Sequence, residues 1–198
     1  MPEEVFSVFE LPPAPALDTA ALKEQFARLS AQLHPDKFQQ SPPEQKKEAE
    51  ARYARINKAW QILRDPKERL IYLYELESGA KPKDVQKIPP GTMDLFVEVG
   101  QLCQKVDAFL KEKAQASSAL EKASLLARSL AQQDETISLG NKIAAAEQQL
   151  DIDLVALDLD WRNGKKDFDM LETLYRKYSY ISRWKQQLEE RQLALLAD

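Results

Sequence analysis

The chain has 198 residues, of which 43% are hydrophobic and 30% are charged, and its formal net charge is −4. This balance is typical of a globular protein with one or two domains and excludes a disordered chain. No stretch approaches the roughly 18 consecutive apolar residues of a membrane span, and the first residues lack the features of a secretory signal, so we expect a cytoplasmic protein with no membrane contact. The slightly acidic charge gives no general reason to bind nucleic acid.

The chemistry open to this chain is limited by a single cysteine, Cys103, and a single histidine, His34. One cysteine excludes an internal disulfide and a cysteine-rich zinc site, so Cys103 is expected to be a small buried hydrophobe. One histidine leaves no second imidazole ligand, and no phosphate-binding loop or nucleophile–base pair is evident. We therefore expect a protein that is not an enzyme and holds no cofactor or metal. Four carboxylates that could suggest a divalent cation are expected to form a solvated face instead: Asp151, Asp153, Asp158 and Asp160.

Proline and glycine divide the chain into two parts. All 11 prolines lie at or before Pro90. Since a proline inside a helix costs about 3 kcal/mol and a glycine about 1 kcal/mol, the second part is predicted to consist of long helices. Residues 78–92 are rich in both breakers and are typical of a linker. The prediction is an all-α protein with one domain at 1–77, a linker at 78–92 and a second domain at 93–198.

Four short helices are predicted in the first part, beginning with an apolar turn near the N-terminus. The second helix follows an N-cap at Asp18 and should end before Pro35, because the residue before a proline is pushed out of the α region. A third helix should begin at a serine cap, Ser41, and end at Asp65, and a fourth should cover 70–76. The apolar positions that define the second and third helices are Leu22, Phe26, Leu29, Leu33, Ala49, Tyr53, Ile56, Trp60 and Leu63.

The second part should form an antiparallel bundle of three or four long helices. The first runs from about Met93 to Lys113. Over 118–161 the apolar pattern slips at Gly140, so one kinked helix or two helices would satisfy it, and the partly alternating segment 151–160 makes a strand a weaker alternative. A last helix follows a turn at Asn163–Lys165. The expected core positions are Leu95, Val99, Leu102, Val106, Phe109, Ala123, Leu126, Leu130, Ile137, Ile143, Ala146, Leu150, Leu154, Leu157, Trp161, Leu171, Leu174, Tyr178, Ile181 and Leu188.

The loop between the second and third predicted helices contains the sequence His34-Pro35-Asp36-Lys37-Phe38. By itself this sequence is a turn in which proline fixes φ and the aspartate makes a local hydrogen bond. Its placement within a small four-helix unit resembles the J-domain, the module with which J-proteins engage chaperones of the seventy-kilodalton heat-shock class. Two further stretches share the resemblance, Phe6–Pro12 and Ile56–Leu63 followed by Asp65-Pro66.

The resemblance to the J-domain implies an interaction function. The loop would dock on the ATPase domain of the chaperone and bias it toward ATP hydrolysis. The residues implied to bind the chaperone are His34, Pro35, Asp36, Lys37, Lys23 and Arg28. A constrained loop presents one carboxylate and one imidazole in a fixed orientation, and charged hydrogen bonds then discriminate well between partners. Because the preceding helix supplies just two of these cations, salt should weaken binding modestly.

The layout of the whole chain looks like the HscB family: a terminal J-domain, a linker and a helical bundle, with no Gly-Phe-rich stretch and no CxxC repeats. That resemblance implies delivery of the iron-sulfur scaffold IscU to a dedicated chaperone, HscA. The scaffold would bind to the first bundle helix and to an aromatic residue of the last. The implied positions here are Phe96, Val97, Gly100, Gln101, Gln104 and Tyr180, where Gln101 and Gln104 stand in place of the glutamates common in relatives.

Several alternatives remain open from the residues alone. The bundle could bind another client of a J-protein, because the two glutamates are missing, or the chain could be a helical adaptor whose loop is inert. Phe96 and Val97 lie off the core pattern of their helix, as do Tyr180 and Trp184 of the last helix. These four side chains could form a partner surface, or they could pack against the first domain or a neighbouring helix.

Overall fold

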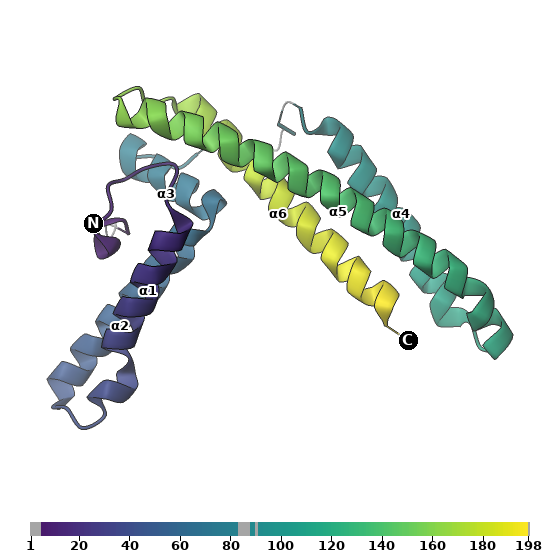
Figure 1. The fold of residues 1–198 in the computed structure, drawn as a ribbon, viewed down its shortest axis with the longest axis horizontal. Coiled ribbons are helices and arrows are strands. Elements are labelled where there is room, and N and C mark those ends of the chain that lie inside the picture. Colours follow the sequence, from purple (N-terminus) through teal and green to yellow (C-terminus); the bar gives the residue numbers. More distant parts are fainter. Residues whose placement is uncertain (1–4, 83–87, 90, 198) are drawn as a thin grey trace. The chain divides into compact units, whose positions relative to one another are not determined.

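The computed structural model describes residues 5–82, 88–89 and 91–197, and every regular element in these ranges is helical (Figure 1). This confirms the predicted all-α class. The predicted linker 78–92 includes residues 83–87 and 90, which lie outside the described residues. The elements are a 3-10 turn η1 (Ser7–Phe9), α1 (Thr19–Leu33), a 3-10 turn η2 (Pro35–Phe38), α2 (Pro43–Arg64), α3 (Pro66–Ser78), α4 (Met93–Gln115), α5 (Ala119–Arg162) and α6 (Phe168–Leu196).

The chain forms two compact units. Unit 1 contains residues 1–84 and 153–175, and unit 2 contains residues 85–152 and 176–198. The end of α5 and the start of α6 therefore cluster with the N-terminal helices. The expected domains 1–77 and 93–198 stay a prediction about which segments fold on their own.

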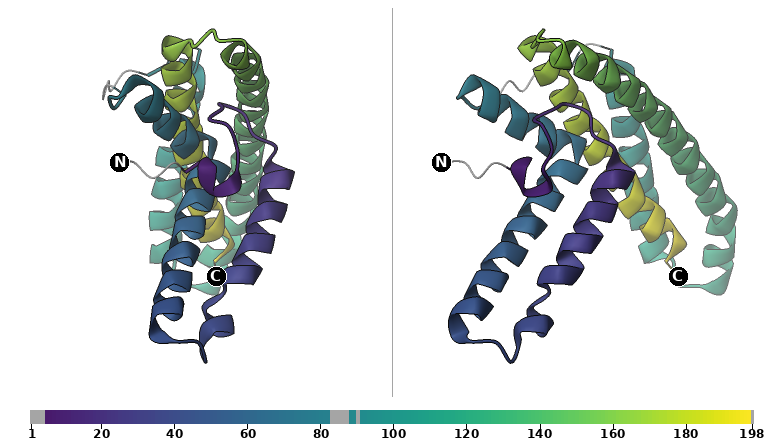
Figure 2. Two further views of the ribbon diagram at one scale, coloured as in Figure 1. Left: turned by 90° about the vertical axis from the view of Figure 1, so that its left-hand side faces the viewer. Right: turned by 60° about the vertical axis from the view of Figure 1, so that its left-hand side comes forward.

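The α1–α2 hairpin dominates unit 1, and the two helices lie side by side in both views of Figure 2. The side chain of Asp18 caps α1 as predicted, accepting hydrogen bonds from the backbone N–H groups of Ala20 and Ala21, each at 3.0 Å. Between the helices, the rings of Phe26 and Trp60 stack with centroids 4.6 Å apart. The expected hairpin core is thus formed by the predicted apolar positions, of which Leu22, Ala49, Ile56 and Leu63 are fully buried.

Two local predictions in unit 1 need correction. The first of the four helices is only the 3-10 turn η1, because Glu10 adopts a left-handed conformation (φ 54°) that ends it. Ser41 does not cap α2, which begins at Pro43 with Pro42 in the N-cap position and no side-chain cap bond. Pro43 needs no donor in the first turn, so the helix starts without that cap.

Arg69 is a buried residue that the sequence patterns did not single out. It is 2% exposed, and its guanidinium donates to the backbone oxygens of Pro15 (2.8 Å) and Leu63 (2.5 Å). Because a buried cation needs its hydrogen bonds satisfied, these carbonyls fix the loop before α1 against the junction of α2 and α3.

The turn between α5 and α6 completes unit 1. Gly164 takes a left-handed conformation (φ 83°) there, which a side chain would disfavour. Phe168 packs edge-on against Tyr74 of α3 and against Trp161, with both centroid distances 5.6 Å. Asp158 is buried, accepts a hydrogen bond from the N–H of Ala16 at 3.3 Å and pairs with Arg162 at 2.6 Å.

Unit 2 contains α4, the part of α5 up to Ile152 and the part of α6 from Arg176 onward. The core pattern predicted for α4 is confirmed at Val99, Leu102, Val106 and Phe109, while Leu95 is half-buried. The pattern predicted for α6 and for the second half of α5 is confirmed as well, with Ala146 half-buried. The buried residues of these two helices that were predicted are Ile143, Leu150, Leu154, Leu157, Trp161, Leu171, Leu174, Tyr178, Ile181 and Leu188.

Helix α5 settles the alternatives left open for 118–161. It is one continuous helix of 44 residues, so the strand at 151–160 is excluded. In its first half the predicted core pattern is wrong, because Ala123, Leu126, Leu130 and Ile137 are exposed. The buried side there contains Leu125, Ser129, Gln132, Thr136 and Leu139.

Hydrogen bonds explain how Ser129 and Thr136 can face inward on this side of α5. The hydroxyl of Thr136 donates to the backbone oxygen of Gln132 at 2.7 Å, and that of Ser129 donates to the backbone oxygen of Leu195 at 3.4 Å. Hydroxyl groups that find such acceptors are tolerated in a core. Among the described residues, no helix is long and apolar enough to cross a membrane.

Candidate functional site

The His34-Pro35-Asp36 loop forms where α1 is forced to stop. His34 leaves the helical region (φ −56°, ψ 130°), as expected for a residue before proline, and it serves both as the C-cap of α1 and as the N-cap of η2. The backbone N–H of Lys37 donates to the oxygen of His34 at 3.0 Å, which closes the turn. The loop is therefore a short, backbone-bonded 3-10 turn.

The two polar side chains of this loop are held by their own neighbours. Nδ1 of His34 accepts a hydrogen bond from the backbone N–H of Asp36 at 3.4 Å and lies 3.4 Å from a carboxylate oxygen of the same residue. The other carboxylate oxygen accepts from Gln39 at 3.3 Å. The ring of Tyr53, on α2, meets the imidazole edge-on at 5.6 Å. The histidine is 48% exposed and the aspartate 74%, so both groups are oriented yet open to a partner.

Of the basic residues implied to bind the chaperone, the structure gathers only Lys37 with the loop. Arg28 and Lys23 are exposed on α1, six and eleven positions before His34, which corresponds to about 9 Å and 16 Å along the helix. The two cations are five positions apart and so lie roughly 140° apart around the axis. Arg28 borders a surface groove together with Leu11 and Leu22, whereas Lys23 points to another side of α1.

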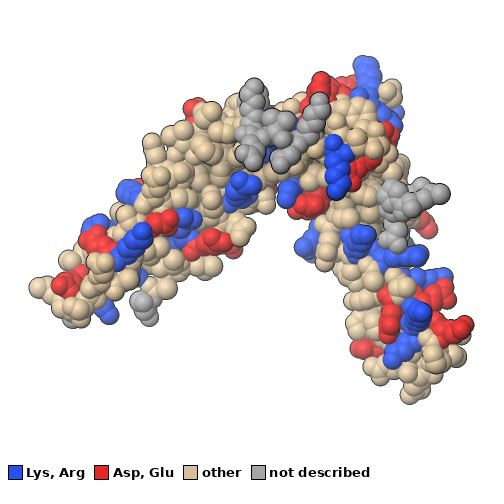
Figure 3. All heavy atoms as spheres, turned by 180° about the vertical axis from the view of Figure 1, so that it is seen from behind, with Lys and Arg blue, Asp and Glu red and all other residues tan. Residues whose placement is uncertain are grey.

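Charge over the rest of the surface is mixed. On the face drawn in Figure 3, basic and acidic side chains alternate over the described residues without an extended patch of one sign. Several ion pairs account for this pattern, among them Arg52 with Glu48 at 2.7 Å. The expectation that net charge alone attracts no nucleic acid stays a prediction.

The residues implied to bind the scaffold lie mostly on the outward side of α4. Phe96 and Val97 are 42% and 45% exposed, and Gly100 and Gln104 follow them at helical spacing and are exposed as well. Met93, which is also exposed, extends this surface by one turn. We call these five residues the α4 face.

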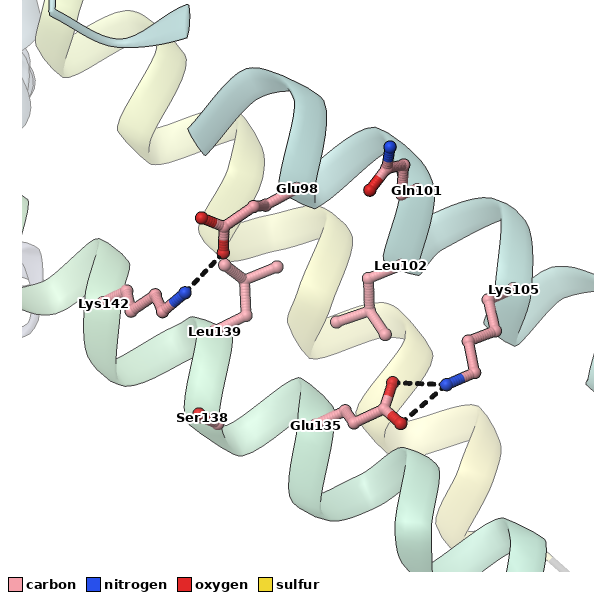
Figure 4. Close-up of a pocket in the computed structure, with 8 residues that line it drawn as sticks. All are labelled: Glu98, Gln101, Leu102, Lys105, Glu135, Ser138, Leu139 and Lys142. Carbon is pink, nitrogen blue, oxygen red and sulfur yellow. Dashed lines mark hydrogen bonds and ion pairs between the residues drawn. The ribbon is translucent and has the colours of Figure 1, made fainter. Parts of the chain in front are cut away.

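Gln101 borders the α4 face and is exposed as well. It lines a groove of about 330 Å³ between the two helices, with Leu102 and Leu139 beneath (Figure 4). Two ion pairs bridge the helices along this groove. Glu98 pairs with Lys142, and Lys105 pairs with Glu135, each at 2.6 Å.

Tyr180 and Trp184, the two aromatic residues of α6 that lie off the predicted core pattern, differ in burial. Trp184 is 3% exposed and belongs to the core of unit 2, so packing rather than partner binding explains it. Tyr180 is half-buried, with its ring 5.6 Å from that of Trp184 and 5.8 Å from the guanidinium of Arg183.

The structure also places the residues weighed as metal ligands. No group of three His, Cys, Asp or Glu side chains suited to a metal ion occurs within the described ranges. Asp158 is buried and paired, as described above, so the expectation of a solvated face is wrong at that position. Asp151 accepts a hydrogen bond from Tyr178 at 2.7 Å. Cys103 is buried as predicted, and burial raises the pKa of its thiol despite the nearby Arg191.

Two contacts around these sites escaped sequence reasoning. Tyr53 was assigned to the core because its spacing is helical, yet its ring also contacts His34. Arg191 of α6 pairs with Asp107 of α4 at 2.7 Å beside Cys103, and these two residues are 84 positions apart in the chain. Neither contact has a local sequence signal, because each depends on which helix faces cross.

The N-terminal helices are similar to a known domain family. Residues 4–72 match the DnaJ domain family. Curated relatives named co-chaperone protein HscB homolog occur in Paraburkholderia phytofirmans and Paraburkholderia xenovorans. Each is 42% identical to this chain over 71 residues, which is 36% of this chain and 41% of the relative. The match thus spans about two fifths of the length of these relatives.

Solved structures extend the likeness to the rest of the fold. The chaperone HscB from Vibrio cholerae has a TM-score of 0.64 and 23% identity, covering 97% of this chain and 99% of that one. Human co-chaperone protein HscB has a TM-score of 0.63 and 18% identity, covering 97% and 83%. Residues 4–72 thus carry a DnaJ domain, and the chain has the fold of the HscB structures. The J-domain resemblance based on His34-Pro35-Asp36 is thereby confirmed, and the helical bundle is similar in fold to that of these HscB structures.

Proposed function

We propose that this chain is a co-chaperone of the HscB family. Its loop at His34, Pro35 and Asp36 would stimulate the ATPase of an HscA-like chaperone of the seventy-kilodalton class, and its bundle would deliver an IscU-like scaffold for iron-sulfur cluster assembly. Both partners are expected in the cytoplasm. The chain itself would need no cofactor and would catalyse no reaction.

This proposal rests on the conformation and the exposure of the loop at His34, Pro35 and Asp36. The imidazole of His34 and the carboxylate of Asp36 are held at 3.4 Å by local bonds and remain exposed. A partner that binds them pays little entropy for ordering them. Charge-assisted hydrogen bonds from a cationic pocket to the carboxylate would supply both strength and selectivity.

The α4 face supports the client half of the proposal. Met93, Phe96 and Val97 keep large apolar side chains in solvent although the buried side of the same helix is well supplied with them. Exposed apolar groups gathered on one helix face are typical of a protein-binding surface. Gly100 opens space beside them, since a methyl group at this position would meet no atom within 4 Å.

The testing experiment is steady-state ATP hydrolysis by the HscA-like chaperone of the same organism, with and without purified scaffold. The full chain should accelerate turnover, and scaffold should raise it further. His34→Gln should abolish the acceleration. Gln40→Ala, an exposed change just after the loop, is the matched control and should behave as the parent. Equal stimulation by the His34→Gln variant would contradict the proposal, as would ATP turnover by this chain alone.

A second candidate is a J-domain co-chaperone for a different client. It is favoured by one observation, namely that Gln101 and Gln104 carry no charge. In the same ATPase assay, stimulation that depends on His34 but ignores the scaffold would select this candidate. Scaffold-dependent stimulation would exclude it.

A further inference from the structure

Helices α4 and α6 of unit 2 are joined at two places. A carboxylate oxygen of Asp107 on α4 accepts a hydrogen bond from the guanidinium of Arg191 on α6 at 2.7 Å, and the ammonium of Lys113 donates to the backbone oxygen of Ala197. Each contact joins residues that are 84 positions apart in the chain. Six residues further along α4 therefore correspond to six residues further along α6, so the two helices run parallel and in step. Figure 1 shows the same direction for both ribbons.

The arginine of this connection is largely buried. The side chain of Arg191 is 19% exposed, and besides Asp107 it donates to the backbone oxygen of Gln187 at 3.0 Å. Its Nε, however, is buried and has no hydrogen-bond partner in the described part of the chain. A buried donor without an acceptor costs free energy, so an apolar side chain of similar length would serve stability as well or better. Fixing the register of the two helices is the role that best accounts for this ion pair.

The same register brings two residues of the implied client surface to one level. Phe96 lies eleven residues before Asp107, and Tyr180 lies eleven residues before Arg191. Eleven residues are three helical turns to within about 20°, so each aromatic residue lies on the same side of its helix as the charged residue. Because Asp107 and Arg191 meet, Phe96 and Tyr180 both lie on the sides of α4 and α6 that meet at this pair, about 16 Å further along the bundle.

Two buried residues lie between these levels at helical spacing. Cys103 on α4 and Trp184 on α6 are 8% and 3% exposed, and the ring of Tyr180 lies 5.6 Å from that of Trp184. Phe96 is 42% exposed and Tyr180 is half-buried, so both rings remain open to a partner. Two aromatic groups beside a buried apolar layer fit an apolar segment of a partner protein.

We propose that Arg191 is a positioning residue for client binding. Through Asp107 it holds α4 and α6 in step, so that Phe96 and Tyr180 bind one apolar segment of the client together. The inference rests on the client half of the proposed function and adds to it the requirement that the two helices act as one surface. It assigns no direct contact with the client to Arg191.

The test is calorimetric titration of the full chain and its variants with purified scaffold. Arg191→Met keeps the length of the side chain and removes its charged hydrogen bonds, and it should weaken binding about tenfold because the two rings are no longer held in place. Asp107→Asn leaves a neutral acceptor and should weaken binding about threefold. Lys185→Met breaks an ion pair of 2.7 Å between α6 and α5 instead, so it is the matched control and should bind within about twofold of the parent. The circular dichroism of each variant should match that of the parent.

A double-mutant cycle separates positioning from a general structural role. In the parent, Phe96→Ala combined with Tyr180→Ala should lose several-fold less affinity than the product of the two single losses, because the two rings hold the same segment. In the Arg191→Met background the two losses should multiply. A general loss of stability would weaken binding in every member of the cycle and leave this coupling unchanged.

Three results would overturn the inference and leave the proposed function in place. Arg191→Met could bind the scaffold as tightly as the parent, Lys185→Met could lose as much affinity as Arg191→Met, or the losses from Phe96→Ala and Tyr180→Ala could already multiply in the parent. Absence of scaffold binding by the parent is a different outcome, because it would contradict the client half of the proposed function and the inference with it.

Discussion

In the α1–α2 hairpin, the apolar side chains expected in the core turn toward the facing helix, whereas in the first half of α5 those expected in the core turn toward solvent. Leu22 and Ile56 of the hairpin are buried, while Leu126 and Leu130 of α5 are more than half exposed. Both segments show a similar periodicity in sequence. The difference is that the hairpin helices are bounded by Asp18, Pro35 and Asp65, which fix where each begins and ends, and α5 continues for 44 residues without a proline.

The periodicity of apolar residues therefore locates a helix but does not say which of its sides is buried. A short capped helix has one apolar side to bury. A long helix can carry two, and the facing side chains of its own bundle decide between them. In α5 the hydrogen bonds of Ser129 and Thr136 satisfy their hydroxyl groups inside the unit, while Leu126 and Leu130 stay exposed.

The largest effect is expected at the loop of the hairpin. Asp36→Asn removes the charge while keeping the shape, so a cationic pocket would lose a charge-assisted hydrogen bond worth about 1.5–3 kcal/mol. Stimulation of the chaperone's ATPase should fall roughly 10-fold to 100-fold in a steady-state assay. Gln39→Ala removes only the neighbour that donates to this carboxylate, and it should cost less than about threefold. Equal losses in both variants would mean that loop order, and not the charge, matters.

The next effect concerns the stability of the region that presents the loop. Arg69→Met should leave the backbone oxygens of Pro15 and Leu63 without their buried donor, at roughly 1–3 kcal/mol for each. The unfolding free energy of the full chain, measured by urea unfolding, should therefore fall by about 2–6 kcal/mol. Lys67→Met removes a partly exposed ion pair with Glu68 and is the matched control, with an expected loss of about 1 kcal/mol or less. Comparable stability of the two variants would refute the structural role given to Arg69.

A smaller effect is expected on the bundle. Phe96→Ala should weaken scaffold binding about tenfold, or about 1.4 kcal/mol, because a large apolar contact is lost. Calorimetric titration with purified scaffold measures it. The side chain is 42% exposed, so the unfolding free energy should hardly change. Leu193→Ala, on α6, should bind like the parent, and unchanged affinity of the Phe96 variant would remove the α4 face from the client site.

The smallest effect concerns Cys103. Burial raises the pKa of its thiol above the ordinary value. As the pH rises, the thiol therefore loses its proton in the unfolded chain before it does so in the folded chain. The stabilising contribution is complete below the ordinary thiol pKa and is lost as the pH rises through the folded-state pKa. Urea unfolding from neutral to alkaline pH should show this loss in the parent and less of it in Cys103→Ala. Parallel curves for the two proteins would contradict it.

Much of the fold was predictable because its signals are local. Asp18 caps α1, the His34-Pro35 step ends it, and the absence of proline after Pro90 indicates the long helices. The loop itself was predictable for the same reason, since three adjacent residues define it. The exposed side of α5 was not, because it depends on residues of α4 and α6 far away in the chain. Arg69 was missed because nothing in its immediate sequence indicates two carbonyl acceptors, one of them 54 positions away.

The packing of residues 153–175 with the N-terminal helices also constrains how the chain is made. The acceptor for the N–H of Ala16 is on Asp158, and the ring that meets Tyr74 is on Phe168. A ribosome adding about 5–20 residues per second needs roughly 5–20 s to travel from the end of α3 to the end of this segment. During that interval the loop that carries His34 is already synthesised, but unit 1 lacks its last packing layer. Completion of the N-terminal unit is thus timed by the synthesis of α5 and the start of α6.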